Sequence, residues 1–536
     1  MNVMKVVFNY FSKNKLIFIF TFVIIIVVAF ISLLPPRLLG IIVDDVIKQD
    51  KYDLLWRYAS IYTILYVFIG IVSFLKDFVL VKISQGITKK IRYTMLKHLN
   101  IISYEELSQL TSGNIEANFN NDVDAINELI TSGAVSIIID LLKVIGISIS
   151  IFLYSLYFGF IILGFIPLLI IFTSFVRKRM FNSQFIARKL EGGVNSQILE
   201  NVENIEAIKI YKASNYASKK YHSALLQHYN ASMKSSIYDS IFSPVMQITQ
   251  NIIIAAVVIL IAKDNAIFGM SVGMVVSAIA YLKDLFSPIE AMGMEIQTIQ
   301  KSMAGIKRIN HFFKYETEEN KKDIENFDYE HIIIKFDNVT FYYENGVDVI
   351  KGYSLTMKDN DKIVLKGDSG AGKSTIFKLA YGLIKPKSGK ITINGIDAHL
   401  LSDKMKKRLF SIVYQDYFFS NGTIYEELTL LDNNISKEAC YNTLALVGLK
   451  RIDNIDKKLI LSDFSTGELA LFNIARAVLR NAKVLFLDEM YAKIDPVTAK
   501  MILKVINKVS ENKIVLSINH YGEYIKESRI ENIIKL

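Results

Sequence analysis

A glycine-rich segment in the second half of the chain has the residue types and spacing of a phosphate-binding loop. "GDSGAGKST", residues 367–375, fits the pattern G-x-x-x-x-G-K-S/T and lies between the apolar run "KIVLK" and the helix-forming run "STIFKLAYGLI". Glycines let successive backbone N–H groups turn toward phosphate oxygens, and the helix N-terminus adds partial positive charge. We expect Lys373 to neutralise the β- and γ-phosphates and Ser374 to hold Mg²⁺. The predicted nucleotide contacts in this loop are Gly367, Asp368, Ser369, Gly370, Ala371, Gly372, Lys373, Ser374 and Thr375.

Two further apolar runs end in residues suited to cleaving a phosphate bond. "KVLFLDE" ends in Asp488 and Glu489, and "IVLSINH" ends in His520. Ionised carboxylates beside a buried strand are costly unless a cation or water meets them. We therefore expect Asp488 in the magnesium shell, Glu489 as the base that polarises the attacking water, and His520 on the γ-phosphate side of the same pocket. The alternative for His520 is an ordinary surface histidine.

The short segment "FSTGE", residues 464–468, stands just before the helix-like run "LALFNIARAVL". A serine and a glycine at the start of a helix suit an anion, because the hydroxyl and the backbone N–H groups both face it. Glu468 places a negative charge at the same point, although an acidic residue in the first turn also suits the helix dipole.

The elements around these segments alternate between short β-rich runs and helical runs from residue 331 to the end. This alternation predicts an α/β domain with a largely parallel sheet over residues 331–536. The stretch 314–330, "KYETEENKKDIENFDYE", is densely charged and has no apolar face. It is predicted to be an exposed linker.

The first 313 residues are predicted to form a transmembrane domain. Hydrophobic residues make up 51% of the 536-residue chain and gather in its first half, and the mean hydropathy is +0.31. A helix needs about 20 apolar residues to cross the hydrocarbon core. We expect six spans, at residues 16–34, 58–75, 134–155, 157–176, 241–262 and 266–282. The first span is too long for a signal peptide and is expected to stay in the mature protein.

Basic residues beside the spans predict their orientation. Lysines and arginines gather before span one, after span two and after span four, which places these sides and both chain termini in the cytoplasm. The connections 76–133 and 177–240 are long and have helical apolar spacing. We expect them to be helices that continue past the bilayer, with turns near residues 120–126 and 204–211.

Charge and cysteine content exclude several other classes. The net charge of +10 is explained by the basic residues that flank the spans, so we expect no nucleic-acid partner. The single cysteine, Cys440, excludes an internal disulfide. Asp140 and Lys143 lie in the apolar stretch of span three; they either line a substrate cavity or pair with each other in a cytoplasmic extension of that helix.

Taken together, these segments resemble an ABC transporter half-unit of the exporter type, with one membrane domain fused to one nucleotide-binding domain. The resemblance covers nearly the whole chain and includes "LLPPRLLGIIVDDVI", "TSGNIEANFNNDVDAI" and "SMAGIKRINHFF" in the membrane half. It implies that Tyr343 stacks on adenine, the alternative being a plain strand-face aromatic. It also implies that Gln415 contacts Mg²⁺, water and the membrane domain, and that Asp495 lies in a loop that touches the second nucleotide-binding domain.

In this family the LSGGQ signature of one domain caps the γ-phosphate held by the partner's P-loop, and "FSTGE" falls at its position. Ser465 and Gly467 keep the pattern, whereas Thr466 and Glu468 depart from it. A homodimer would have two equivalent altered sites. A heterodimer would pair this chain's P-loop, Glu489 and His520 with a partner's unaltered signature, and the departure favours this arrangement.

The resemblance implies an ATP-hydrolysing transporter that dimerises in the plasma membrane and exports an amphipathic or hydrophobic solute, such as a peptide, a drug-like compound or a lipid. ATP and Mg²⁺ are the expected cofactors, and the bilayer and a second half-transporter the expected partners. Two alternatives remain: an importer of a metallophore-type solute with the same fold, and a membrane-bound sensor or gate that uses ATP without pumping.

Overall fold

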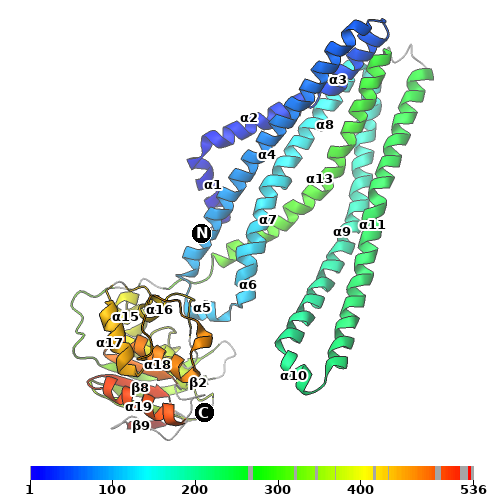
Figure 1. Cartoon of the computed structure of the whole chain (residues 1–536). Helices are drawn as coiled ribbons and strands as arrows, with labels where there is room; N and C mark the ends of the chain where they lie inside the picture. The colour runs from blue at the N-terminus through cyan, green and yellow to red at the C-terminus, as the bar shows by residue number, and fades with distance from the viewer. Residues whose placement is uncertain are drawn as a thin grey trace. The chain divides into compact units, whose positions relative to one another are not determined.

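The computed structural model divides into two compact units that are interleaved along the chain (Figure 1). Unit 1 comprises Met1–Asn100 and Thr111–Lys314, and unit 2 comprises Ile101–Leu110 and Tyr315–Leu536. The structure describes residues 2–263, 270–318, 321, 323–343, 348–368, 370–414, 418–432, 434–488, 496–518 and 529–532.

The described residues of unit 1 form helices. They are α1 (Val3–Lys13), α2 (Lys15–Ile31), α3 (Leu34–Ile41), α4 (Leu55–Leu99), α6 (Ser112–Ala117), α7 (Val123–Glu128), α8 (Ala134–Tyr154), α9 (Leu156–Glu203), α10 (Ile205–Ile210), α11 (Ser214–Lys263) and α13 (Val272–Phe312), with the short turns η1 (Ile42–Ile47), η2 (Tyr52–Leu54), η3 (Asn118–Asp122) and η4 (Leu129–Gly133) between them. Four of them, α4, α9, α11 and α13, have more than 40 residues. The described residues contain six helical stretches long and apolar enough to cross a membrane, which confirms the predicted number of spans.

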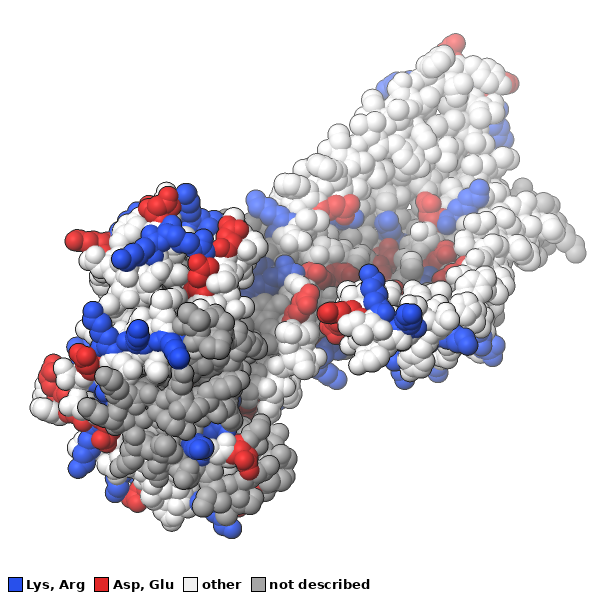
Figure 2. Space-filling model, turned by 60° about the horizontal axis from the view of Figure 1, so that its bottom comes forward, with Lys and Arg blue, Asp and Glu red and all other residues white. Residues whose placement is uncertain are grey.

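Several of these helices are much longer than a bilayer is thick. The 45 residues of α4 extend about 68 Å at 1.5 Å per residue, whereas the hydrocarbon core measures about 30 Å. Figure 2 shows a broad uncharged stretch on the long helices, and Lys, Arg, Asp and Glu gather toward helix ends and over unit 2. The helices therefore continue past the apolar region, as their charge pattern predicts.

Small residues allow α3 to pack closely against α13 in unit 1. A Cβ atom on Gly273 would lie 2.1 Å from the backbone oxygen of Gly40. A larger residue at position 273 would therefore force the two helices apart. Asp44 then accepts a hydrogen bond from the Gly273 backbone N–H at 2.9 Å, and the Tyr281 hydroxyl donates to the Leu33 carbonyl at 2.7 Å.

One of the two predicted turns in the cytoplasmic extensions is wrong. Residues 120–126 are helical, since they fall in η3 and α7. The chain instead breaks after α4, and the short helix α5 (Tyr104–Gln109) follows as part of unit 2. The second prediction is confirmed, because α9 ends at Glu203 and α10 leads into α11 around residues 204–213.

The described residues of unit 2 form two sheets. An antiparallel sheet has the order β2-β1-β4-β5 and a parallel sheet the order β6-β7-β8-β3-β9. The strands are β1 (Ile334–Tyr342), β2 (Asp348–Met357), β3 (Lys362–Lys366), β4 (Ser388–Ile393), β5 (Ile396–Asp397), β6 (Phe410–Val413), β7 (Val484–Asp488), β8 (Ile514–Ile518) and β9 (Arg529–Asn532). The fully buried strand β8 suits a parallel sheet covered on both faces, whereas β1 alternates between buried and exposed residues.

Helices cover the parallel sheet and complete two hydrophobic cores. The helices of unit 2 besides α5 are α14 (Lys373–Ala380), α15 (Asp403–Leu409), α16 (Ile424–Thr429), α17 (Lys437–Val447), α18 (Thr466–Leu479) and α19 (Pro496–Val509), with the 3-10 turns η5 (Ala398–Leu400) and η6 (Leu461–Asp463). One core joins the two sheets to α14, and the other packs α16 to α19 against the parallel sheet. Because α14 follows β3 directly, the connection between them is held at the carboxyl end of the parallel sheet.

Candidate nucleotide site

The predicted phosphate-binding loop connects β3 to α14. Gly370 and Gly372 have φ angles of +84° and +88°, a left-handed conformation that glycine adopts easily. The Lys373 side chain is buried, and its Nζ donates to the backbone oxygens of Gly367 at 2.8 Å and Asp368 at 2.9 Å. The ammonium group therefore lies inside the curve of the loop, where phosphate oxygens would meet it. Ser369 lies outside the described residues.

Replacing Gly372 by alanine is expected to destabilise this loop. A Cβ atom there would lie 3.0 Å from Cγ1 and 3.0 Å from the backbone oxygen of Val349, in addition to the left-handed backbone. Gly395→Ala is a matched control, because Gly395 also has a positive φ but a Cβ atom placed on it would meet no atom within 4 Å. The control should cost about 1–2 kcal/mol for the backbone alone. Gly372→Ala should lower the melting temperature further and weaken ATP binding; equal effects of both variants on both measurements would contradict this.

The predicted adenine-stacking residue, Tyr343, lies beside the start of α14. It follows the last residue of β1 and is 41% exposed. Its hydroxyl lies 3.1 Å from Thr375 Oγ1, and its ring packs edge-on against Phe341 at a centroid distance of 5.0 Å. An exposed aromatic face is thus fixed next to the phosphate-binding loop.

The predicted magnesium ligands Ser374 and Asp488 line one cavity of about 300 Å³ in unit 2. Ser374 lies in the first turn of α14, and Asp488 ends β7. A hydroxyl and a carboxylate are oxygen ligands of the kind that Mg²⁺ prefers, together with water and phosphate oxygens. Both residues therefore fit a magnesium–nucleotide site. The other cavity residues are Tyr104, Phe377, Lys378, Tyr381, Leu383, Ile412, Tyr414 and Phe486.

Four other predicted site residues, Glu489, His520, Gln415 and Asp495, lie outside the described residues. In the sequence, Glu489 directly follows Asp488 and Gln415 directly follows Tyr414; Asp488 and Tyr414 both line this cavity. Their roles stay predictions.

Sequence analysis missed the helix α5, which contributes Tyr104 to this cavity. The segment is held to the linker before β1, because the Ser103 N–H donates to the Glu316 oxygen at 2.8 Å and the Glu318 N–H donates to the Ile101 oxygen at 2.8 Å. Its sequence signal was present in "SYEE", where Ser103 caps the helix by accepting from the Glu106 N–H. This short start signal was overlooked between the long helical stretches Tyr52–Leu99 and Ser112–Tyr154.

The signature segment forms the N-terminus of α18. Ser465 is the N-cap: its Oγ accepts from the Glu468 N–H at 3.2 Å, and Glu468 Oε2 accepts from the Ser465 N–H at 2.9 Å. Thr466 and Gly467 occupy the first turn. Gly467 is buried, and a Cβ atom there would lie 2.8 Å from Thr498 Cγ2 of α19. The N-terminus of α18, which the sequence predicts to face an anion, is therefore capped by Ser465 and Glu468.

Glu468, the residue that departs from the signature, is paired with Arg451, which sequence analysis did not identify. Arg451 Nε lies 2.6 Å from Oε1 and Nη2 lies 3.0 Å from Oε2. Hydrogen bonds from Arg451, and then from the Ser465 N–H, lower the pKa of Glu468, although burial opposes this. The carboxylate is therefore ionised at neutral pH, with a cation beside it.

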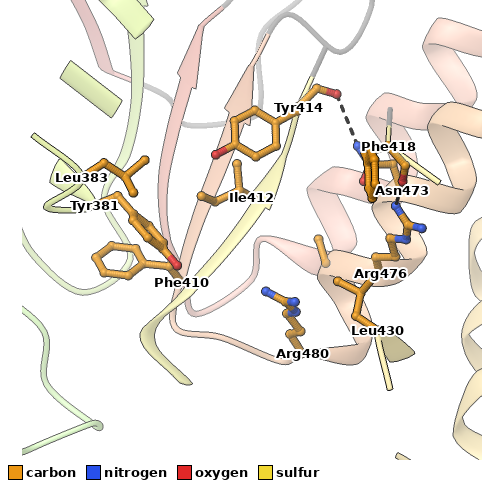
Figure 3. Close-up of a pocket in the computed structure, with 11 residues that line it drawn as sticks. Tyr381, Leu383, Phe410, Ile412, Tyr414, Phe418, Leu430, Asn473, Arg476 and Arg480 are labelled. Atoms are coloured by element: carbon orange, nitrogen blue, oxygen red, sulfur yellow. Dashed lines mark hydrogen bonds between the residues drawn. The ribbon is translucent and has the colours of Figure 1, made fainter. Parts of the chain in front are cut away.

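A second cavity, of about 420 Å³, is lined by Tyr414, by Phe418 and by residues of α18 (Figure 3). Asn473 Nδ2 of α18 donates to the Tyr414 oxygen at 3.3 Å, and Arg476 Nη1 donates to the Phe418 oxygen at 2.7 Å. The signature helix thus holds the chain directly before and after residues 415–417. The lining residues are Tyr381, Leu383, Phe410, Ile412, Tyr414, Phe418, Leu430, Asn473, Arg476, Ala477 and Arg480.

A buried ion pair reinforces this connection. Arg476 Nη2 lies 2.6 Å from Glu427 Oε2, and the Glu427 side chain is 1% exposed. Glu427 Oε1 also accepts from the backbone N–H groups of Ser420 at 2.7 Å and Gly422 at 3.0 Å. Residues 418–422 are therefore fixed to α18 and α16 together.

Comparisons with known proteins agree with this arrangement. The family model described as the ABC transporter transmembrane region matches residues 18–289, and that described as ABC transporter matches residues 350–492. The chain is 25% identical over 531 residues to an uncharacterized ABC transporter ATP-binding protein, YknV, of Bacillus subtilis (strain 168), covering 96% of this chain and 87% of that protein.

Two other relatives have names that state a cargo. A probable multidrug resistance ABC transporter ATP-binding/permease protein, YheH, of Bacillus subtilis (strain 168) is 24% identical over 452 residues, which are 82% of this chain and 66% of that protein. The lactococcin-A transport/processing ATP-binding protein LcnC of Lactococcus lactis subsp. lactis is 25% identical over 519 residues, 92% of this chain and 70% of that protein. With its membrane helices and its ATP-binding unit in a single polypeptide, this chain belongs to the ABC transporter family and couples ATP hydrolysis to transport.

Proposed function

We propose that this chain is one half of a dimeric exporter in the plasma membrane that moves an amphipathic or hydrophobic solute outward, with both chain termini in the cytoplasm. The observation that carries the proposal is the cavity shared by Ser374 and Asp488, next to the buried Lys373, in a chain with six apolar membrane helices. The names of the multidrug and lactococcin relatives support a hydrophobic compound or a peptide as cargo.

The residues of unit 2 have separate proposed roles in ATP binding and hydrolysis. Backbone N–H groups of the phosphate-binding loop and the Lys373 ammonium bind the phosphates, and Tyr343 stacks on adenine. Ser374, Asp488 and Gln415 would hold Mg²⁺, which when bound neutralises charge on the phosphate oxygens. Glu489 accepts the proton of the attacking water, and His520 donates a hydrogen bond toward the γ-phosphate. Ser465, Thr466, Gly467 and Glu468 face the nucleotide of the other half-transporter.

Two short helices are proposed to transmit closure of the nucleotide-binding domains. The first is α5, which supplies Tyr104 to the cavity of Ser374 and Asp488 and replaces residues 120–126 in this role. The second is α10, at the far end of the α9–α11 hairpin. ATP bound across two domains favours the closed state that contains it, so binding shifts the population of the membrane helices toward the outward-facing form.

The test is transport by the purified full chain in lipid vesicles, alone and with candidate second half-transporters. We expect ATP hydrolysis and ATP-dependent movement of a hydrophobic dye or an amphipathic fluorescent peptide, into vesicles whose nucleotide-binding domains face outward. Movement in the opposite direction would support an importer. Hydrolysis that a solute stimulates without accumulation would support a sensor or gate. Activity of the chain alone would establish a homodimer and overturn the preferred heterodimer.

A further inference from the structure

We propose that Arg451 is a positioning residue for the nucleotide that meets the signature segment: it neutralises Glu468 and fixes the residues that lead into α18. The inference rests on the proposed function, because it requires that "FSTGE" faces a triphosphate held by a second nucleotide-binding domain. The pairing explains how "FSTGE", whose fifth residue is the acidic Glu468, can lie beside the negatively charged triphosphate.

Arg451 makes three contacts that converge on the start of α18. Its guanidinium binds both carboxylate oxygens of Glu468, at 2.6 and 3.0 Å, and Nη2 also donates to the Asp463 oxygen at 2.8 Å. The guanidinium carbon lies 4.7 Å from the centroid of the Phe464 ring. One side chain therefore holds the residues on both sides of Ser465.

The remaining hydrogen bonds of Glu468 occupy its carboxylate with Ser465. Oε2 accepts from the Ser465 N–H and from the Ser465 Oγ as well as from Arg451. A carboxylate engaged in this way neither repels a phosphate as strongly as a free one nor leaves the helix start uncapped. Removal of Arg451 would leave an unpaired negative charge in the first turn, where an incoming phosphate needs positive potential.

Folding stability alone does not explain this pair. The side chains of Arg451 and Glu468 are 50% and 28% exposed, and ion pairs of that exposure contribute little to stability because solvent screens them. Lys437 and Asp456 form a comparable exposed pair in and near α17, at 2.7 Å, away from the signature. The two pairs thus allow an effect on the nucleotide to be separated from an effect on folding.

The experiment measures ATP hydrolysis by the full chain in lipid vesicles, with its partner if one is required. Arg451→Ala is expected to lower kcat/KM for ATP by about fivefold to tenfold, a loss reduced by solvent screening of the half-exposed pair. Glu468→Gln should lower the ATP concentration at half-maximal rate by about twofold, because Arg451 then presents an unpaired positive charge. Lys437→Ala should leave the rate unchanged.

The double variant Arg451→Ala with Glu468→Gln decides the mechanism. If charge is the cause, removing both charges restores kcat/KM to within about twofold of the unsubstituted chain. If Arg451 only supports the loop through Asp463 and Phe464, the double variant is no better than Arg451→Ala, and the proposal is wrong. An unchanged rate in Arg451→Ala also overturns it. Absence of hydrolysis in the unsubstituted chain would instead reject the proposed function, and this inference with it.

Discussion

Replacing Glu489 by glutamine is expected to lower ATP turnover by about 10²- to 10⁴-fold, the usual contribution of a general base, while ATP remains bound. Glutamine keeps the size of the side chain but cannot accept the proton of the attacking water. The phosphate contacts of Lys373 and the loop are left in place, because they come from β3 and α14 rather than from β7. Hydrolysis is measured by phosphate release, and retained nucleotide by recovery of labelled ATP with the reconstituted protein.

Lys373→Ala is the contrasting variant for this prediction. It removes the ammonium that lies 2.8 Å from the Gly367 oxygen inside the loop, so it should abolish both hydrolysis and retention of ATP. Glu489→Gln should retain more ATP than the unsubstituted chain, and Lys373→Ala less. Turnover unchanged in Glu489→Gln would reject its assignment as the base, and loss of bound ATP in that variant would assign it to binding instead.

Replacing Arg476 by methionine is expected to destabilise unit 2 by about 3–5 kcal/mol, because it leaves Glu427 buried without its ion partner. In a domain of this size, that change corresponds to a fall in melting temperature of about 6–20 °C. The other bonds of Glu427, from Ser420 and Gly422, remain but do not supply a positive charge. Thermal unfolding of the detergent-solubilised full chain measures the effect.

Arg480→Met is the matched control for Arg476→Met. Arg480 lies one turn further along the chain than Arg476, and both line the cavity of about 420 Å³. Among the described residues, Arg480 forms no ion pair, whereas Arg476 pairs with Glu427. Its replacement should change stability by less than about 1 kcal/mol. Equal melting temperatures in the two variants would show that the buried pair does not stabilise the fold. The combination of Arg476→Met with Glu427→Gln should recover part of the loss, since it removes the unpaired charge as well.

The same pair predicts a dependence of stability on pH. Burial opposes ionisation of Glu427, but hydrogen bonds from Ser420 and Gly422 and the charge of Arg476 lower its pKa overall. A carboxyl whose pKa is lowered on folding stabilises the protein above its unfolded pKa, and this stabilisation is lost as the pH falls through the folded pKa. Melting temperatures of Glu427→Gln should therefore fall less steeply below pH 4.5 than those of the unsubstituted chain.

The elements predicted best from the sequence were those specified by short local patterns. The phosphate-binding loop needs only its glycines, Lys373 and the strand and helix beside it, and the six spans need only their apolar length. The antiparallel sheet was not separated from the parallel one, because pairing partners such as Phe336 and Leu355 are distant in sequence and equally apolar. The role of α5 was missed because its start signal lies between two long helical stretches, Tyr52–Leu99 and Ser112–Tyr154.

No local sequence pattern identifies Arg451 as the partner of Glu468. Arg451 precedes Glu468 by seventeen residues and lies past the end of α17, so only the fold of the intervening loop brings the two together. Sequence reasoning identified the added negative charge at the signature but had no means to find the cation that balances it. The same holds for Glu427 and Arg476, which come from α16 and α18.

The interleaving of the two units has a consequence for synthesis. Ile101–Leu110 leaves the ribosome before residues 111–314 have been made, yet it belongs to the same unit as Tyr315–Leu536. At about 5–20 residues per second, α5 waits at least about 10–40 s for its backbone partner at Glu316 to emerge. The ATPase unit is therefore completed only after the last membrane helix, α13, has been synthesised.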